Sequence, residues 1–253
     1  MSYVAHFCFP VKRLENSRVV LEPFDFWKHA ESFLQGCKDH PELFQYLPYG
    51  PFASIAEFEA FYRVRSGPGE TLFAVLAKLS PSDERGSLAG VIGLLNASPN
   101  NGSVEIGFVN PLRKIGAPLI STSVFGLIEN WQITILPPFQ RTHVASSAVG
   151  LLIAYSLDLP PDGLGLRRCQ WQAHACNEPS RRLAQRMGFT FEGVQRFQRV
   201  IPLHKSGNGF DVSQLPEATG VKLGNARDTA IFAHYCDEWE EKRNLVLKMM
   251  EPR

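Results

Sequence analysis

The sequence predicts an α+β protein in a single domain, residues 1–253. Two segments near the N-terminus have apolar residues at helical spacing, and three strand-like runs follow them without an intervening helix. Further along, a strand, a loop, a helix and another strand follow in that order. With 253 residues, of which 44% are hydrophobic and 20% charged, the chain can bury a sizeable core, and one domain is favoured over two.

The first elements are indicated by periodicity and by a helix-start signal. The run RVVL, Arg18–Leu21, predicts a strand, and the apolar spacing over Phe24–Leu34 predicts a helix. Ser54 and Glu57 form a capping-box pattern, in which each side chain binds a free backbone amide near the other residue. A second helix is therefore expected to begin near Ser54.

Three consecutive strands are expected next. Thr71–Leu79 and Leu88–Asn96 are apolar runs joined by the turn-rich segment SPSDERGS, which indicates an antiparallel hairpin. Apolar and other residues alternate over Ser103–Val109, which predicts a strand with one buried face. Glu105 lies on the opposite face, which could border a cleft. A strand glutamate in such a position is, however, often simply solvated.

A strand, a loop and a helix follow at ITILPPFQRTHVASSAVGLLIAYSLDL. The helix is predicted over Ala145–Leu157, and the loop before it is Gln140–Val144. The first amides of a helix have no acceptor within it, and the helix dipole adds positive potential there, so a phosphate is a natural ligand. Because every strand-to-helix junction has such amides, this pattern alone leaves a purely structural junction open.

A second strand and a short capped helix come next, at RCQWQAH and NEPSRRLAQRMGFTFEG. Arg168–His174 alternates as a half-buried strand does. Asn177 is a good N-cap, and Gly188 can take the left-handed conformation that ends the helix. Asn177 and Ser180 lie in the first turn at the mouth of a strand end, where a ligand would lie.

Composition and missing motifs exclude several function classes. The 26 basic and 25 acidic residues nearly cancel, so no nucleic-acid or membrane partner is indicated. The five cysteines lack C-x-x-C spacing, which argues against a disulfide framework or a zinc site. Neither a leader nor a long apolar run is recognisable, so a soluble cytoplasmic protein is expected. Hydrolase, P-loop and H-E-x-x-H motifs are missing, and nothing calls for a metal.

The order strand, Q-R-T-H-V-A loop, helix, strand and N-E-P-S-R-R-L-A-Q-R-M-G-F-T-F-E-G resembles the GNAT superfamily of acyl-CoA N-acyltransferases, most closely the RimJ/RimL-like branch and its fungal members. The resemblance spans roughly Asn16 to Trp239. It implies a GNAT fold, with a mixed, mostly antiparallel central sheet splayed between its fourth and fifth strands and flanked by helices. It also implies transfer of an acetyl group from acetyl-CoA to a primary amine, either a small molecule or a protein N-terminus, by a monomer or homodimer.

The resemblance also implies roles for individual residues. The amides of the loop and first helical turn would hold the acetyl-CoA pyrophosphate. Asn177 would contact the pantetheine arm, and Ser180 would protonate the departing thiolate, unless it only tightens its helical turn. His143 occupies a position that is commonly glycine, so a modestly rearranged loop is expected. The implied cofactor-binding residues are Gln140, Arg141, Thr142, His143, Val144, Ala145, Ser146, Asn177 and Ser180.

The amine must lose a proton before attack, so a base or a water path is needed. Glu105 is the candidate base, and His174 is the alternative. Trp27, Tyr46 and Tyr49 fall in the region that lines the acceptor pocket in the resembled family, although such aromatic residues more often pack in a core. The irregular segment Pro202–Gly224 could cover the acceptor site.

Residues 109–132 interrupt the resemblance. Deleting them joins EIGF to ITILPPFQRTHV in a continuous strand pattern, so the segment is either a genuine insertion or a retained intron. An active N-acetyltransferase is therefore one hypothesis. The other is a catalytically silent acyl-CoA-binding protein with the same fold, which applies if the insertion or His143 spoils the site.

Overall fold

The structure, a computed structural model, describes residues 7–65, 67–80, 82–83, 85–107, 134–214 and 224–251. The predicted insertion at residues 109–132 lies outside these ranges, as do Phe108, near the end of the strand predicted over Ser103–Val109, and residues 215–223 of the segment expected to cover the acceptor site. The strands are β1 (Leu14–Glu15), β2 (Val19–Pro23), β3 (Thr71–Ala77), β4 (Ser87–Ser98), β5 (Ser103–Ile106), β6 (Thr134–Ile135), β7 (Arg168–His174), β8 (Thr190–Ile201) and β9 (Asn225–Tyr235). The α-helices are α1 (Phe26–Cys37), α2 (Ile55–Arg65), α3 (Val144–Leu157), α4 (Glu178–Arg186) and α5 (Trp239–Met250).

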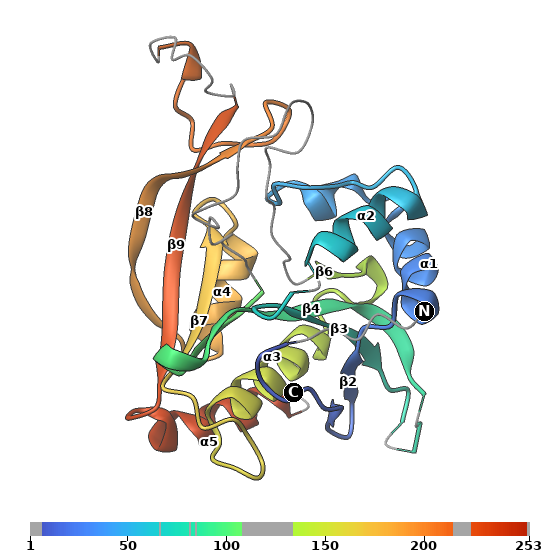
Figure 1. Ribbon diagram of the computed structural model, residues 1–253, viewed down its shortest axis with the longest axis vertical. Coiled ribbons are helices and arrows are strands. Elements are labelled where there is room, and N and C mark those ends of the chain that lie inside the picture. The colour runs from blue at the N-terminus through green and yellow to red at the C-terminus, as the bar shows by residue number, and fades with distance from the viewer. Residues whose placement is uncertain are drawn as a thin grey trace.

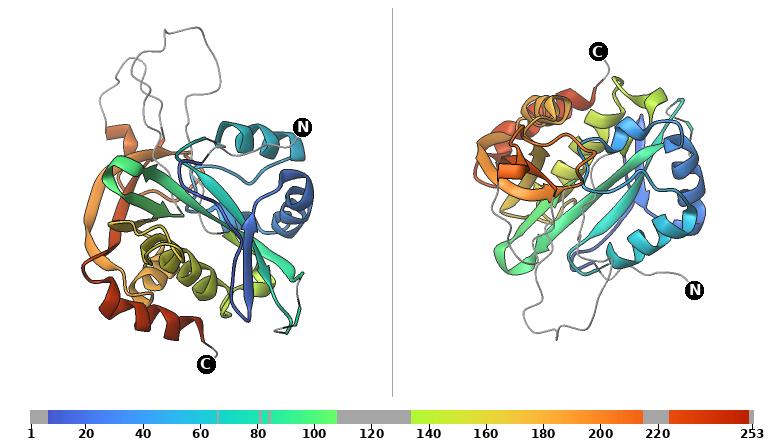
Figure 2. Two further views of the ribbon diagram at one scale, coloured as in Figure 1. Left: turned by 60° about the horizontal axis from the view of Figure 1, so that its bottom comes forward. Right: turned by 90° about the horizontal axis from the view of Figure 1, so that it is seen from above.

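Within the described residues the strands form one mixed sheet in the order β1-β2-β3-β4-β5-β7-β9-β8, with β6 paired to β4 (Figure 1). Strands β5 and β7 pair in parallel, whereas the other neighbours pair antiparallel. Helices α1 and α2 lie together on one side of the sheet, and α3 and α5 pack together on the other, as the two further views show (Figure 2). The predicted α+β fold with a mostly antiparallel sheet is confirmed.

The sheet has a hydrophobic core on each face. Phe73 and Val75 belong to the core under α3 and α5, whereas Leu72 and Ala74 belong to the core under α1 and α2. Every residue of β3 is buried. This double burial explains why the strand is a continuous apolar run rather than an alternating one.

Helix starts follow the capping signals, with small shifts. The carboxylate of Asp25 accepts hydrogen bonds from the amides of Trp27 and Lys28, so α1 begins at Phe26. The Ser54 hydroxyl accepts from the Glu57 amide at 3.2 Å. The Glu57 carboxylate accepts from the amide of Ala53 at 2.7 Å, one residue before the position that the capping box predicts.

The α4 region follows its sequence signals. The Asn177 side chain caps the helix by accepting from the Ser180 amide at 3.2 Å. Gly188 has φ +83°, the left-handed conformation expected of it, and the amide of Phe189 donates to the carbonyl of Ala184 at 3.1 Å. This pattern closes the helix as a Schellman motif does.

The parallel pair β5 and β7 separates at one end, where the resemblance predicts a splay. Their ladder runs from Ser103 paired with Arg168 to Ile106 paired with Trp171. Strand β5 ends there, but β7 continues to His174. The sheet therefore opens beyond Ile106 and Trp171.

Candidate active site

A cavity of about 890 Å³ lies where β5 and β7 separate. Ile106 and Gly107 line it from β5 and the residue after it, and Trp171 and Gln172 line it from β7. Its walls also include the start of α3, the start of α4 and the 3₁₀ turn Pro41–Phe44 with the residues after it. This volume is in the range that holds a cofactor or drug-sized ligand.

The loop before α3 presents free amides to this cavity. The Ser147 amide donates to the His143 carbonyl at 2.9 Å and is the first i to i−4 bond of the helix, so the preceding amides have no acceptor within it. The Val144 amide donates to the Thr142 hydroxyl at 3.3 Å, which leaves the amides of Ala145 and Ser146 as the free ones of the first turn, and Arg141 turns the loop with a left-handed φ of +59°. This arrangement is suited to an anion.

Most of the predicted cofactor-binding residues meet at the cavity. Val144 is the exception, because its side chain is 1% exposed and packs in the core, which leaves only its main chain near the loop. The residues of the predicted set that line the cavity are Gln140, Arg141, Thr142, His143, Ala145, Ser146, Asn177 and Ser180.

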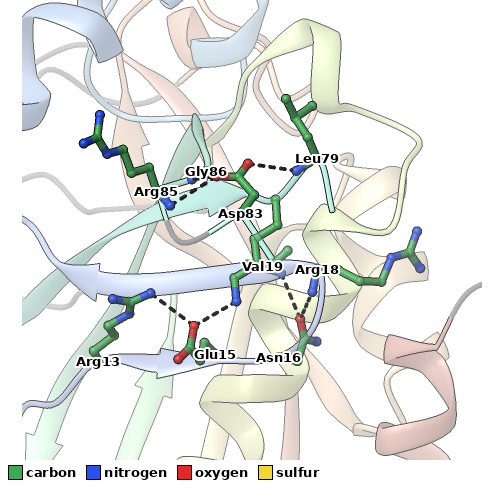
Figure 3. A network of polar contacts seen from close by, with 10 residues as sticks. Arg13, Glu15, Asn16, Arg18, Val19, Leu79, Asp83, Arg85 and Gly86 are labelled. Atoms are coloured by element: carbon green, nitrogen blue, oxygen red, sulfur yellow. Dashed lines mark hydrogen bonds and ion pairs between the residues drawn. The ribbon is translucent and has the colours of Figure 1, made fainter. Parts of the chain in front are cut away.

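Arg18 also lines the cavity, although no motif in the sequence marks it. The Asn16 side chain accepts hydrogen bonds from the amides of Arg18 and Val19 at 2.9 and 2.8 Å, which fixes the turn before β2 (Figure 3). Nε2 of His143 is buried without a hydrogen-bond partner among the described residues. Burial, and then the charge of Arg18, lower the pKa of His143, so the positive charge at this end of the cavity comes from arginine.

Ser180 is held from two sides at the start of α4. Its amide donates to Asn177, and its hydroxyl oxygen accepts from the indole N–H of Trp171 at 3.2 Å. Trp171 is 3% exposed and reaches Ser180 from β7. Because the oxygen is the acceptor in this bond, the hydroxyl proton remains available for donation into the cavity.

Glu105 is buried rather than half exposed. It is 1% exposed, and its Oε2 accepts from Asn96 at 2.9 Å and from Gln170 at 3.1 Å. The expectation of an open strand face was wrong because β4 and β7 flank β5 and supply these amides. Burial raises the pKa of Glu105 to about 8, against the smaller opposing effects of Asn96 and the nearby arginines. Glu105 does not line the cavity.

The raised pKa of Glu105 predicts a pH-dependent stability. From its ordinary value of 4.5 up to about 8, the folded carboxyl keeps a proton that the unfolded one has lost. Stability is therefore lost as pH rises through this window.

The free energy of unfolding of Glu105→Gln, relative to that of the wild type, is expected to rise by at least about 1 kcal/mol between pH 5 and pH 8. Urea unfolding at both pH values measures it, with Glu31→Gln, at an exposed site, as control. A pH-independent difference would contradict the raised pKa.

His174 has no nitrogen free for proton transfer. It is fully buried, its Nδ1 accepts from the Cys176 amide at 3.0 Å, and its Nε2 lies 3.0 Å from the Ser206 carbonyl, to which it must donate. Burial, and then the charge of Arg227, lower the pKa of His174 to about 4. The ring is therefore neutral and structural in this arrangement.

Of the three aromatic residues predicted for the acceptor, the structure brings Tyr46 to the cavity. Trp27 is 69% exposed on α1, and Tyr49 is 6% exposed within an aromatic cluster that includes Phe61, 4.6 Å away between ring centres. Neither lines the cavity. Glu42, Leu43 and Gln45 do line it beside Tyr46, and no local motif distinguishes them in the sequence.

Two further observations concern metals and membranes. Among the described residues, no three or more histidine, cysteine, aspartate or glutamate side chains gather as metal ligands would. Within the same ranges, no helix combines the length and the apolar character needed to cross a bilayer.

The chain is similar to known acetyltransferases. The family model described as "Acetyltransferase (GNAT) domain" matches residues 18–190. A GCN5-related N-acetyltransferase from Brucella melitensis is 28% identical, with a TM-score of 0.70 and coverage of 97% of this chain and 88% of that one. No curated protein matches the sequence.

Two more distant solved structures share the fold. A spermidine N-acetyltransferase from Vibrio cholerae, in complex with CoA and spermine, is 16% identical, with a TM-score of 0.57 and coverage of 89% of this chain and 99% of that one. RimJ from Mycobacterium smegmatis, in complex with CoA-disulfide, is 13% identical, with a TM-score of 0.59 and coverage of 94% and 93%. Since the family model covers more than half of the chain, the protein belongs to the GNAT acetyltransferase family and is an acyltransferase.

Proposed function

We propose that the protein is an N-acetyltransferase that moves an acetyl group from acetyl-CoA to a primary amine by direct attack in a ternary complex. The observation that carries the proposal is one cavity that joins the free amides of the α3 start to the Ser180 hydroxyl, across the opening between β5 and β7. The Vibrio structure is a complex with CoA and the Mycobacterium structure a complex with CoA-disulfide, which supports the choice of donor. We further propose that the chain belongs to the RimJ/RimL-like branch, of the fungal type, and acts in the cytoplasm.

The residues fit the donor from end to end. The main-chain donors in the first turn of α3, at Ala145 and Ser146, and the Arg18 guanidinium are suited to the pyrophosphate. Asn177, which caps α4, also lines the cavity and would contact the pantetheine arm, and the Ser180 hydroxyl is bonded to Trp171 beside the sheet opening. His143 leaves the cavity open, so its bulk at a position that is commonly glycine does not fill the site.

The protein needs to supply only an acid and a base, because acetyl-CoA supplies an activated thioester and no metal is required. Ser180 has the geometry of the acid that returns a proton to the sulfur, since Trp171 occupies its oxygen as acceptor. We propose Glu105 as the base, acting through an intervening water. Its Oε1 has no hydrogen-bond partner among the described residues, and with a pKa of about 8 its ionised form, which grows as pH rises toward 8, would accept the proton. Tyr46 would flank the acceptor amine.

Thiol release tests this proposal. Acetyl-CoA is mixed with the protein and a panel of primary amines that contains spermidine, amino acids and short peptides with free N-termini, and free CoA thiol is followed by colour reaction. Amine-dependent release is expected, with the acetylated amine identified by mass spectrometry. Saturable CoA binding without release for any amine would instead identify a silent acyl-CoA-binding protein.

A further inference from the structure

The ammonium group of Lys205 ties together two distant segments of the chain. Lys205 follows β8 and is 6% exposed. Its Nζ donates hydrogen bonds to the carbonyl oxygens of Leu47, Tyr49 and Gly50 at 2.6, 2.5 and 2.8 Å. These carbonyls lie in the connection between α1 and α2, more than 150 residues away in the sequence. The α1–α2 connection and the end of β8, which Lys205 follows, both lie in the upper half of Figure 1.

Lysine suits this position better than arginine does. An ammonium has three donors on a compact charge, which matches three converging carbonyls, whereas a guanidinium is a broad planar fork. The main chain of Lys205 is itself anchored, because the Asn225 side chain at the start of β9 donates to the carbonyls of Leu203 and Lys205 at 3.0 and 2.7 Å. The Lys205 contact therefore joins the α1–α2 connection to the end of the sheet.

The wall of the cavity lies directly beside this contact. Gln45 and Tyr46 immediately precede the carbonyls that Lys205 holds, and both line the cavity. Gln45 Nε2 donates to the hydroxyl of Ser206 at 3.3 Å. The ring centres of Tyr46 and His174 are 5.4 Å apart, and His174 in turn binds the Ser206 carbonyl. Residues 45–50, residues 205–206 and the end of β7 thus form one connected unit.

We propose that Lys205 is a positioning residue that fixes the acceptor wall of the active site, and so sets how the amine is held. This inference rests on the proposed function. The donor end of the cavity is built separately, by the start of α3, where Gln140 is bonded to the Ile135 carbonyl at 3.0 Å. Loss of the Lys205 contact should therefore weaken use of the amine and spare binding of CoA.

Lys205→Met tests the proposal, because methionine keeps the length of the side chain and removes its donors. Lys242→Met is the matched control, since Lys242 Nζ also makes two hydrogen bonds, to Thr190 and Glu238 at 2.7 and 2.5 Å, but away from the cavity. Lys205→Arg is a second variant that keeps the charge without the compact shape. Amide hydrogen exchange, CoA affinity by calorimetry, and the KM values for acetyl-CoA and for the amine are measured for each.

In Lys205→Met we expect exchange to rise about tenfold or more in both residues 43–50 and 203–208, because the two segments depend on one contact. CoA affinity should stay within about twofold, while the KM for the amine rises about tenfold. Lys205→Arg should share part of this change, and Lys242→Met should show none of it.

The outcomes separate the proposals. Equal losses for acetyl-CoA and the amine, or faster exchange in residues 203–208 alone, would overturn the role of Lys205. If Lys205→Met does not fold, Lys205→Arg is measured in its place by the same comparison. If the wild-type protein acetylates no amine, the proposed function fails, and unchanged exchange in residues 43–50 would then still refute the Lys205 contact as the support of this wall.

Discussion

Replacing Ser180 by alanine is expected to lower kcat for acetyl transfer by about 10²-fold or more, the usual contribution of a positioned acid. The hydroxyl lies at the sheet opening, and its oxygen accepts from the Trp171 N–H at 3.2 Å, so its proton is available to a ligand in the cavity. Proton donation stabilises the sulfur as it departs and prevents the thiolate from attacking the product. The KM for acetyl-CoA should change little, since the main-chain donors at the other end of the cavity are retained.

Steady-state kinetics with acetyl-CoA and an amine that emerges from the panel measure this effect. Ser156→Ala is the matched control, because its hydroxyl is also hydrogen bonded, to the Leu152 carbonyl at 2.7 Å, but it is fully buried in α3 and does not line the cavity. Trp171→Phe, which removes the N–H, should lower kcat by a smaller factor than Ser180→Ala. An unchanged kcat in Ser180→Ala would leave Ser180 with only its place in the helical turn.

Replacing Ala145 by aspartate is expected to weaken CoA binding by about 100-fold or more, while the protein without ligand becomes no less stable. Ala145 is in the first turn of α3 and lines the cavity. A carboxylate there interacts favourably with the helix dipole, by about 0.3–1 kcal/mol, and satisfies free amides. The same charge occupies the anion site and repels a pyrophosphate. An anion site predicts weaker CoA binding with no loss of stability, whereas a general defect in folding would lower both.

Calorimetry with CoA and thermal unfolding without it provide the two measurements. The matched control is Ala56→Asp, the same change at the same helix position in α2, where Ala56 is exposed and far from the cavity lining. That variant should bind CoA normally. Retained CoA affinity in Ala145→Asp would show that the phosphates bind elsewhere and would refute the donor assignment.

Much of the fold could be predicted because local patterns encode it. The hairpin of β3 and β4 follows from two apolar runs and a polar turn, and the end of α4 follows from Gly188, whose left-handed φ is the one expected. The start of α3 was predicted to within one residue. In each case the determining residues are neighbours in the chain, so a short window of sequence contains the whole signal.

The site was harder to predict where it depends on contacts between distant segments. Alternation placed Glu105 on the correct face of β5, but its burial depends on Asn96 and Gln170 from neighbouring strands. Arg18 reaches the cavity from a turn more than 100 residues before α3. Lys205 has no local signal at all, because its acceptors are main-chain carbonyls that any residue supplies. The assignments of the individual cofactor-binding residues remain predictions.

The two-faced burial of β3 has a consequence for mutations in the core. Phe73 and Val75 support the layer that carries α3, while Leu72 and Ala74 support the layer that carries α1 and α2. Under the proposed function the first layer carries the donor site and the second carries the acceptor wall. A core mutation on one face of β3 should therefore disturb one of these two sites more than the other.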